Sequence, residues 1–422
     1  MVTQSAHKIP LVSILIPVLN RPQDIVSCLE SLLNLDFPRD DYEIIVVDNN
    51  STDNTKEVIQ RYPVRYVFEP RKGRGSARNA GVKASTGKYL AFIDSDCIAT
   101  PNWLTELVKA LEENPHIAAF GGKIVAYKMN NWVEKYFEIQ GAIDQELALL
   151  SAERGVGLPR FVTANVVVRN DVFKKVGYFD DGLFTGEDTD LSWRMILNGF
   201  QVGYVPTAVV YHKHITDMFK LINHSFEQGM AFYLKLRKYD GILFIALSSR
   251  PRFFLGKILY LLMLPFIFFR IRGNYKKDKS SLAALAIIDS LGRTMGELSA
   301  LISEWLHLAK PITPFSPSDL DKMLHKSLRI EINGFYLRVT PGTIWLANND
   351  LIIFTNIMDR HFYRLNETST RIWQILCETE SFSRTVKIVS REYQIPEDNI
   401  AQDARELLEQ LEKEKLVLRD AK

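Results

Sequence analysis

At 422 residues, 46% of them hydrophobic, the chain is long enough for two or three domains with substantial cores. Its net charge of +2 points to no particular class of partner, and three distant cysteines without a CxxC pair argue against a disulfide framework or a zinc site. The first residues, MVTQSAHKIP, hold no apolar signal core, so we expect a cytoplasmic protein.

The first hundred residues alternate between strand-like and helix-like segments. The helix-like segments follow Asp24, a possible N-cap, and Asp53. The apolar runs of strand length are Val12–Val18, Tyr42–Val47, Val64–Phe68 and Tyr89–Ile93. This order predicts a mostly parallel sheet with helices on both faces, which binds ligands at the carboxyl ends of its strands.

Polar side chains follow three of these strands. They are Asn20 and Arg21, Asp48 to Asp53, and the Asp-Ser-Asp of Asp94 to Asp96. Two carboxylates at one strand end raise each other's pKa unless a cation neutralises them. Mg²⁺ or Mn²⁺ would do so, because these ions favour oxygen ligands from carboxylates and phosphates. The alternative is an ordinary strand-ending turn, in which Asp and Ser are common.

Four motifs in order carry a resemblance to a known family. They are SILIPVLNRP, EIIVVDNNSTDNT, GSARNAGVKASTGKYLAFIDSD and GEDTDLSWRMILNGF. The series resembles that of the family 2 glycosyltransferases, and we assign residues from about 10 to 300 to this resemblance. It implies a glycosyltransferase A-type fold, a nucleotide-sugar donor, a divalent cation and inversion at the sugar carbon.

The resemblance also implies roles for single residues. Asp48 matches the residue that reads the nucleobase, Asp94 the one that reaches the nucleoside, and Asp96 the metal ligand. Three further residues of these motifs are expected at the donor site: Pro17, Asn20 and Arg78. Arg78 would bind the phosphates or the ribose, and the alternative is a solvated surface charge.

The acids of GEDTDLSWR are candidates for the acceptor side. An inverting displacement needs one general base within hydrogen-bond reach of the attacking hydroxyl. We expect Asp188 to be that base and Glu187 to orient it, with a helix beginning near Asp190. Alternatively, these acids only favour a helix N-terminus through the macrodipole.

His212 is a candidate second metal ligand, because relatives often carry a histidine after the strand that we expect at Gln201–Tyr211. The alternative is a surface histidine. The sequence further predicts a sheet segment at Phe161–Val168 and, before it, an acceptor-binding loop from Tyr127 to Pro159.

The composition changes after residue 240. Phe253–Ile271 is apolar except for Lys257 and has basic flanks, so it fits either a spanning helix weakened by Pro265 or a helix lying on an anionic membrane surface. Leu282–Ile302 reads as an amphipathic helix. We therefore expect attachment to the cytoplasmic face of the membrane, with core helices that join two domains as the alternative.

Beyond the Pro-rich stretch Pro311–Ser318, the last hundred residues predict a small separate domain. Its sequence FYRLNETSTRIWQILCETESFSRTVKIVSREYQI resembles PqqD-like domains, the small winged-helix modules that capture leader peptides by adding them to a sheet edge. Residues 324–422 hold 14 Lys plus Arg and 15 Asp plus Glu, which argues against nucleic acid as the partner. A structural appendage is the remaining alternative. The expected segments are Tyr336–Val339, Thr343–Ala347, Ile352–Phe354 and Phe362–Leu365 as strands, and Ser369–Cys377, Ser383–Tyr393 and Asp398–Lys415 as helices.

Taken together, the sequence predicts a catalytic domain at 8–240, a membrane-associating segment at 241–310, a linker at 311–319 and a PqqD-like domain at 320–422. The expected activity is metal-dependent, inverting transfer of a sugar to a ribosomal peptide or peptide-derived acceptor. The alternatives are a lipid-linked or polysaccharide acceptor and a non-catalytic scaffold that recruits peptide.

Overall fold

The structure is a computed structural model, and it describes residues 9–141, 143–149, 160–183, 185–239, 277–305, 329–332, 335–339, 343–348, 351–356, 362–379 and 381–421. The predictions for Phe253–Ile271 and Pro311–Ser318 lie outside the described residues. None of the helices in the described ranges is both long enough and apolar enough to cross a membrane.

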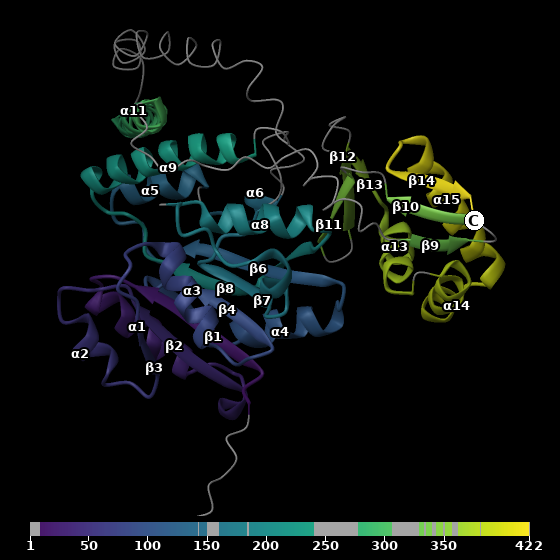
Figure 1. Cartoon of the computed structure of the whole chain (residues 1–422), viewed down its shortest axis with the longest axis horizontal. Coiled ribbons are helices and arrows are strands. Elements are labelled where there is room, and N and C mark those ends of the chain that lie inside the picture. Colours follow the sequence, from purple (N-terminus) through teal and green to yellow (C-terminus); the bar gives the residue numbers. More distant parts are fainter. Residues whose placement is uncertain are drawn as a thin grey trace, which may run out of the picture.

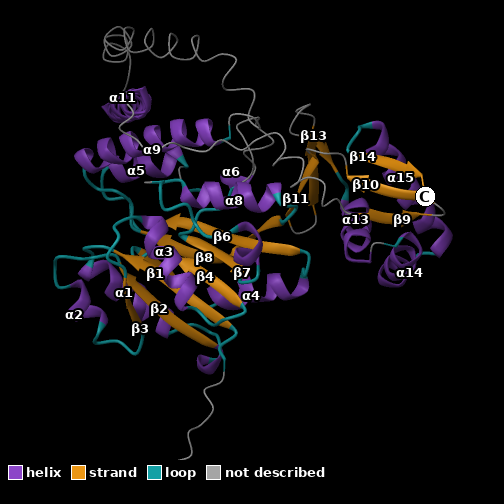
Figure 2. Ribbon diagram, viewed as in Figure 1, coloured by secondary structure: helices purple, strands orange, loops and turns teal. Residues whose placement is uncertain are grey.

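An eight-stranded sheet forms the centre of the N-terminal domain (Figures 1 and 2). Its strands lie in the order β3-β2-β1-β4-β7-β6-β8-β5. Four strand pairs are parallel and three are antiparallel, so the predicted mostly parallel sheet is confirmed. The strands are β1 Val12–Val18, β2 Tyr42–Asp48, β3 Arg65–Phe68, β4 Tyr89–Ile93, β5 Cys97–Ala99, β6 Ile117–Ala126, β7 Asn165–Arg169 and β8 Gln201–His212.

Helices cover both faces of this sheet because alternate strand residues point to opposite sides. In β1, Ile14 and Ile16 pack in one core with α1 (Pro22–Leu33) and α4 (Trp103–Glu113). Leu15 packs in the other core, against helices on the opposite face. Those helices are α3 (Arg74–Ala84), α7 (Val172–Val176) and α8 (Glu187–Leu197), and the short α2 (Thr55–Ile59) lies beside α1.

The expectation that Asp24 caps the first helix is wrong, because the helix begins before Asp24. Pro22 opens α1, Arg21 is its N-cap, and Asp24 lies within the first turn. Proline suits this place because the first helical amides lack intrahelical partners in any case.

The switch point of the sheet lies between β1 and β4. These strands are parallel neighbours, yet the chain leaves β1 toward β2 and β3, whereas the strands that follow β4 lie on its other side. Ligands of such sheets bind in the crevice outside the carboxyl ends at this point. The loops after β1 and β4 therefore flank the expected ligand crevice.

The expected loop Tyr127–Pro159 is instead largely helical where the structure describes it. It contains α5 (Trp132–Gln140) and α6 (Gln145–Leu149). The helix α5 begins with a capping box formed by Asn131 and Glu134, which satisfies otherwise unpaired amides.

Two long helices, α9 (Met218–Lys238) and α11 (Lys277–Trp305), pack against each other near α5 (Figure 1). Their backbones approach so closely that a Cβ atom at Gly229 would lie 1.9 Å from the carbonyl oxygen of Arg293. The helix expected at Leu282–Ile302 is confirmed. Its charged residues do not all face solvent, because Asp289 is buried and accepts hydrogen bonds from Ser225 (2.6 Å) and Tyr136 (3.2 Å).

In its described residues, the C-terminal domain contains two small antiparallel sheets and three helices (Figure 2). Four strands and the three helices match the predicted segments, whereas β9 and β14, which flank β10, were not predicted. The strand β14 reaches β10 from the far end of the domain, while β9 pairs with β10 as its neighbour in sequence. The strand β11 lies close to β8, and His116 Nδ1 lies 3.4 Å from Glu378 Oε1, so this domain contacts the N-terminal domain. The elements are β9 Arg329–Ile332, β10 Phe335–Val339, β11 Thr343–Asn348, β12 Leu351–Asn356, β13 Phe362–Arg364, α13 Glu367–Thr379, α14 Phe382–Tyr393, α15 Glu397–Lys413 and β14 Val417–Ala421.

Candidate active site

Asp48 ends β2 as a buried, firmly held carboxylate. Its Oδ1 accepts from the backbone amide of Ser51 at 2.9 Å, and its Oδ2 accepts from the hydroxyl of Tyr66 at 2.8 Å. Each carboxylate oxygen can accept a second hydrogen bond. Asp48 therefore keeps acceptor capacity at the carboxyl edge of the sheet, and its contact with a nucleobase stays a prediction.

Asn20 ties the loop after β1 to the loop after β2. Its Oδ1 accepts from the backbone amide of Thr52 at 2.8 Å. Asn20 adopts a φ of 52°, a left-handed conformation that asparagine tolerates better than most residues. Pro17 lies beside Val47 in the register of β1 and β2 and is partly buried. Asn20 thus holds one side of the crevice in place.

Arg78 joins the two halves of the candidate site. It extends from α3 and forms ion pairs with Asp94 at 2.9 Å and with Glu187 at the start of α8. Its side chain is 4% exposed, so the surface-charge alternative is wrong. Burial by itself would raise the pKa of Asp94, but nearby cations, Arg78 foremost, together outweigh it, and the pKa lies below its ordinary value. The guanidinium is buried between these two carboxylates, and its direct contact with a donor stays a prediction.

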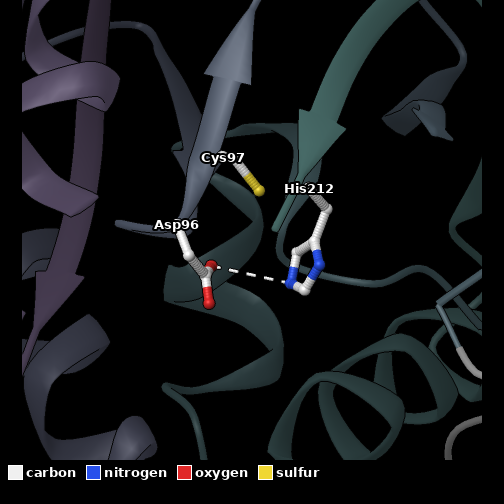
Figure 3. A group of neighbouring side chains, drawn as sticks. All are labelled: Asp96, Cys97 and His212. Atoms are coloured by element: carbon white, nitrogen blue, oxygen red, sulfur yellow. Dashed lines mark ion pairs between the residues drawn. The ribbon is translucent and has the colours of Figure 1, made fainter. Parts of the chain in front are cut away.

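The side chains of Asp96 and His212 point toward each other (Figure 3). The Oδ1 atom of Asp96 lies 3.6 Å from His212 Nε2, and its Oδ2 lies 2.8 Å from a guanidinium nitrogen of Arg21. His212 closes β8 rather than following it, and the antiparallel pairing of β5 with β8 sets it opposite Cys97. Strand pairing therefore brings together the two residues that the sequence proposed as metal ligands.

The donor set fits a divalent cation. Ligand atoms of Asp96, Cys97 and His212 lie within 4.8 Å of one another. Burial, with Asp96 and Asp94 nearby, raises the pKa of the Cys97 thiol well above its ordinary value. A protonated thiol is a poor ligand, since the thiolate is the binding form. The carboxylate and imidazole remain, and these suit Mn²⁺, while Mg²⁺ would draw mainly on the carboxylate and substrate oxygens.

The three acids at the start of α8 differ in burial and partners. Glu187 is buried against Arg78. Asp190 is fully buried and bound by Arg194 (2.8 Å) and Lys238 (2.6 Å). Asp188 is only partly buried, and its Oδ1 accepts from the backbone amide of Thr189 at 2.7 Å. Of the three, Asp188 is the carboxylate with access to a substrate.

Sequence reasoning missed Lys235 of α9, which lies over the start of α8. A Cβ atom at Gly186 would lie 2.8 Å from Lys235 Nζ, so the amine sits against the residue that precedes Glu187. Burial lowers the pKa of Lys235 to about 8. No signal in the sequence marks it, because α9 and α8 meet only in the folded chain. The sequence places Arg21 after β1, but it does not predict the ion pair of Arg21 with Asp96.

Comparison with known proteins identifies both ends of the chain. Residues 13–177 match the model of "Glycosyl transferase family 2", and residues 355–417 match "Coenzyme PQQ synthesis protein D (PqqD)". Glycosyltransferase AglE of Haloferax volcanii is 29% identical over 212 residues, which is 48% of this chain and 67% of that protein. The pre-mycofactocin glycosyltransferase of Mycobacterium tuberculosis is 30% identical over 238 residues, 54% of this chain and only about half (48%) of that protein.

Among solved structures, the mannosyltransferase PcManGT from Pyrobaculum calidifontis, in complex with GDP-Man and Mn²⁺, aligns with a TM-score of 0.45 and 16% identity. The alignment covers 76% of this chain and 79% of that one. Asp188 and His212 lie beyond the 13–177 match, and their roles stay predictions.

Proposed function

We propose that this chain, which belongs to the family 2 glycosyltransferases through its N-terminal domain and ends in a PqqD-like domain, transfers a sugar from a nucleotide diphosphate to an acceptor hydroxyl with inversion. The observation that carries the proposal is the buried Arg78. Its guanidinium holds Asp94, at the carboxyl end of β4, and Glu187, next to Asp188, at a fixed spacing. A donor site and an acceptor base are thereby joined through one side chain.

On the donor side, Asp48 accepts a hydrogen bond from the nucleobase and Asp94 accepts one from the nucleoside. Asp96 and His212 would hold the divalent cation. When bound, this cation supplies Lewis-acid stabilisation of the charge that develops on the leaving phosphate. Arg21, which forms an ion pair with Asp96, is a further cation at this site and would be available to the phosphates of the donor.

On the acceptor side, Asp188 accepts the proton of the attacking hydroxyl as the new bond to the sugar carbon forms. One base suffices for an inverting transfer, unlike a glycosidase with its two flanking carboxylates. Glu187 pairs with Arg78, which also binds Asp94, so Glu187 helps to hold both in place. Lys235, whose amine lies against Gly186, adds a positive charge beside these acids.

The acceptor is proposed to be a peptide or a peptide-derived molecule. The PqqD-like domain supports this, because the small sheet β14-β10-β9 ends in strand edges to which an extended peptide can add. The relative named pre-mycofactocin glycosyltransferase is consistent with the same class of acceptor. Contact between the C-terminal domain and β8 would keep a captured peptide near the strand that carries His212.

A panel of nucleotide sugars tests the proposal. The full chain is incubated with each donor and Mn²⁺ or Mg²⁺, and release of the nucleoside diphosphate is measured with and without short peptides encoded near its gene. We expect one donor class to be hydrolysed slowly without peptide and transferred faster with it. If no donor binds or turns over in the wild type, or if Asp188→Asn transfers as fast as the wild type, the proposed mechanism is wrong.

A further inference from the structure

Three side chains form a hydrogen-bonded row that leads away from the cation site. His212 Nδ1 lies 3.1 Å from His214 Nδ1, and His214 Nε2 lies 2.7 Å from Glu138 Oε2. The row connects β8 to α5, and Phe137 of α5 packs against both imidazole rings, with centroids 6.5 Å from His212 and 5.0 Å from His214. The ring of His214 is fully buried, whereas Glu138 is 40% exposed.

The partners fix the direction of these bonds. A carboxylate only accepts, so His214 Nε2 carries a proton and donates it to Glu138. A His214 ring that carries its single proton on Nε2 has its lone pair on Nδ1. His214 Nδ1 therefore accepts, and the donor is His212 Nδ1–H.

This assignment leaves the lone pair of His212 on Nε2, which faces Asp96 Oδ1 at 3.6 Å. Two acceptors then face each other without a proton between them. Such a contact becomes favourable when a cation binds both atoms, because each atom then has a positive partner. Had Nε2 carried the proton, His212 would donate to Asp96 and would not be available as a ligand.

We infer that His214 and Glu138 are positioning residues that hold His212 in the tautomer with its Nε2 lone pair turned toward Asp96, ready for a divalent cation. The inference rests on the metal dependence in the proposed function. It gives a reason for the second histidine of the sequence His-Lys-His, which the mechanism otherwise leaves unused. A histidine ligand whose other nitrogen is hydrogen-bonded in this way is held in one orientation and is a stronger base.

Matched variants separate positioning from packing. His214→Phe keeps an aromatic ring against Phe137 but cannot accept from His212, whereas His214→Asn places an amide oxygen near the position of Nδ1. Glu138→Leu removes the acceptor for His214, and Glu138→Gln keeps a carbonyl oxygen there. Because Glu138 is partly exposed, the second pair of variants remains useful if His214→Phe fails to fold.

The first measurement uses the metal-free protein. In ¹⁵N NMR of the histidine rings, the wild type should show His212 as the Nδ1–H tautomer. We expect His214→Phe and Glu138→Leu to shift His212 toward the Nε2–H tautomer, and His214→Asn and Glu138→Gln to retain the wild-type form. An unchanged His212 tautomer in both disruptive variants would overturn the inference.

The second measurement is Mn²⁺ affinity by electron paramagnetic resonance with bound nucleoside diphosphate. Loss of such supporting hydrogen bonds weakens metal binding by about 10- to 100-fold, and we expect this for His214→Phe and Glu138→Leu but not for their matched partners. Equal weakening in both members of each pair would assign the row to packing alone and overturn the inference. Asp96→Ala separates a failure of this inference from a failure of the proposed function. If Asp96→Ala leaves Mn²⁺ binding intact, the metal site of the proposed function is wrong. If only His214→Phe leaves Mn²⁺ binding intact, only the role of His214 is contradicted.

Discussion

Replacing Asp190 with asparagine should destabilise the protein far more than the same replacement of Asp188. Asp190 is fully buried and pairs with Arg194, Lys238 and the hydroxyl of Tyr239, which lies 2.7 Å from its Oδ1. Breaking a buried ion pair by removing one charge costs about 3–5 kcal/mol. Asparagine still accepts a hydrogen bond, and Lys238 keeps its 2.6 Å ion pair with Asp180, so we expect the lower end, about 3 kcal/mol.

For a domain of this size each kcal/mol lowers the melting temperature by roughly 2–4 °C, so Asp190→Asn should lose roughly 6–12 °C. Asp188 is partly exposed, and its amide variant should stay within about 0.5 kcal/mol of the wild type. Its effect should appear in the rate, because asparagine cannot accept the proton. A fall of about 10²- to 10⁴-fold is typical of the loss of a general base.

The assay pairs thermal unfolding with turnover at a temperature well below both transitions, and it adds donor affinity by calorimetry. Asp188→Asn should bind the donor with wild-type affinity, melt normally and turn over slowly. Asp190→Asn should melt early yet keep most of its turnover while folded. If Asp188→Asn melts as early as Asp190→Asn, or if Asp190→Asn melts normally while losing its rate, the division of roles among these acids is wrong.

Three further predictions concern the cation, the C-terminal domain and Lys235. Asp96→Ala should abolish transfer and weaken donor binding in the presence of Mn²⁺, and full wild-type activity in excess chelator would contradict metal dependence. Removing residues 320–422 should raise the acceptor KM far more than it lowers donor hydrolysis. The transfer rate should recover at high acceptor concentration, because tethering acts through effective concentration. Equal transfer rates of the truncated and full chains with dilute peptide would refute acceptor capture. Burial lowers the pKa of Lys235 from 10.5 to about 8. The buried charge therefore lowers the free energy of unfolding by its full amount below pH 8, and this loss disappears as the pH rises toward 10.5. Lys235→Met should therefore melt above the wild type at pH 7, and a melting-temperature difference that does not shrink by pH 10 would contradict this origin.

Local patterns in the sequence were sufficient for the elements that carry the donor site. The bounds of β1 and β4 match the predicted runs, because a buried strand in a parallel sheet is apolar on both faces and ends abruptly in polar residues. The same runs placed Asp48 and Asp94 at strand ends. In the C-terminal domain, the periodic apolar residues of α15, such as Ile400 and Leu411, are buried as their spacing predicts.

Helix periodicity showed where α11 lies but not which way its polar residues face. Asp289 and Glu297 recur at helical spacing, which normally marks a solvated face, yet both are buried against other elements of the fold. A row of charges within one helix has the same pattern whether its partners are water or buried side chains such as Ser225. Only the packing of α11 on α9 and α5 distinguishes the two.

The sequence by itself determined the class of fold, the strand ends and the acidic residues from which the site is built, because these depend on local composition and spacing. Tertiary structure alone decided how those residues are used. Pairing of β5 with β8 set His212 opposite Cys97 and beside Asp96, and burial of Arg78 between two carboxylates made it a link within the site rather than a surface charge. These contacts join residues that are far apart in the chain, and their geometry follows from strand register and side-chain burial, which no local pattern specifies.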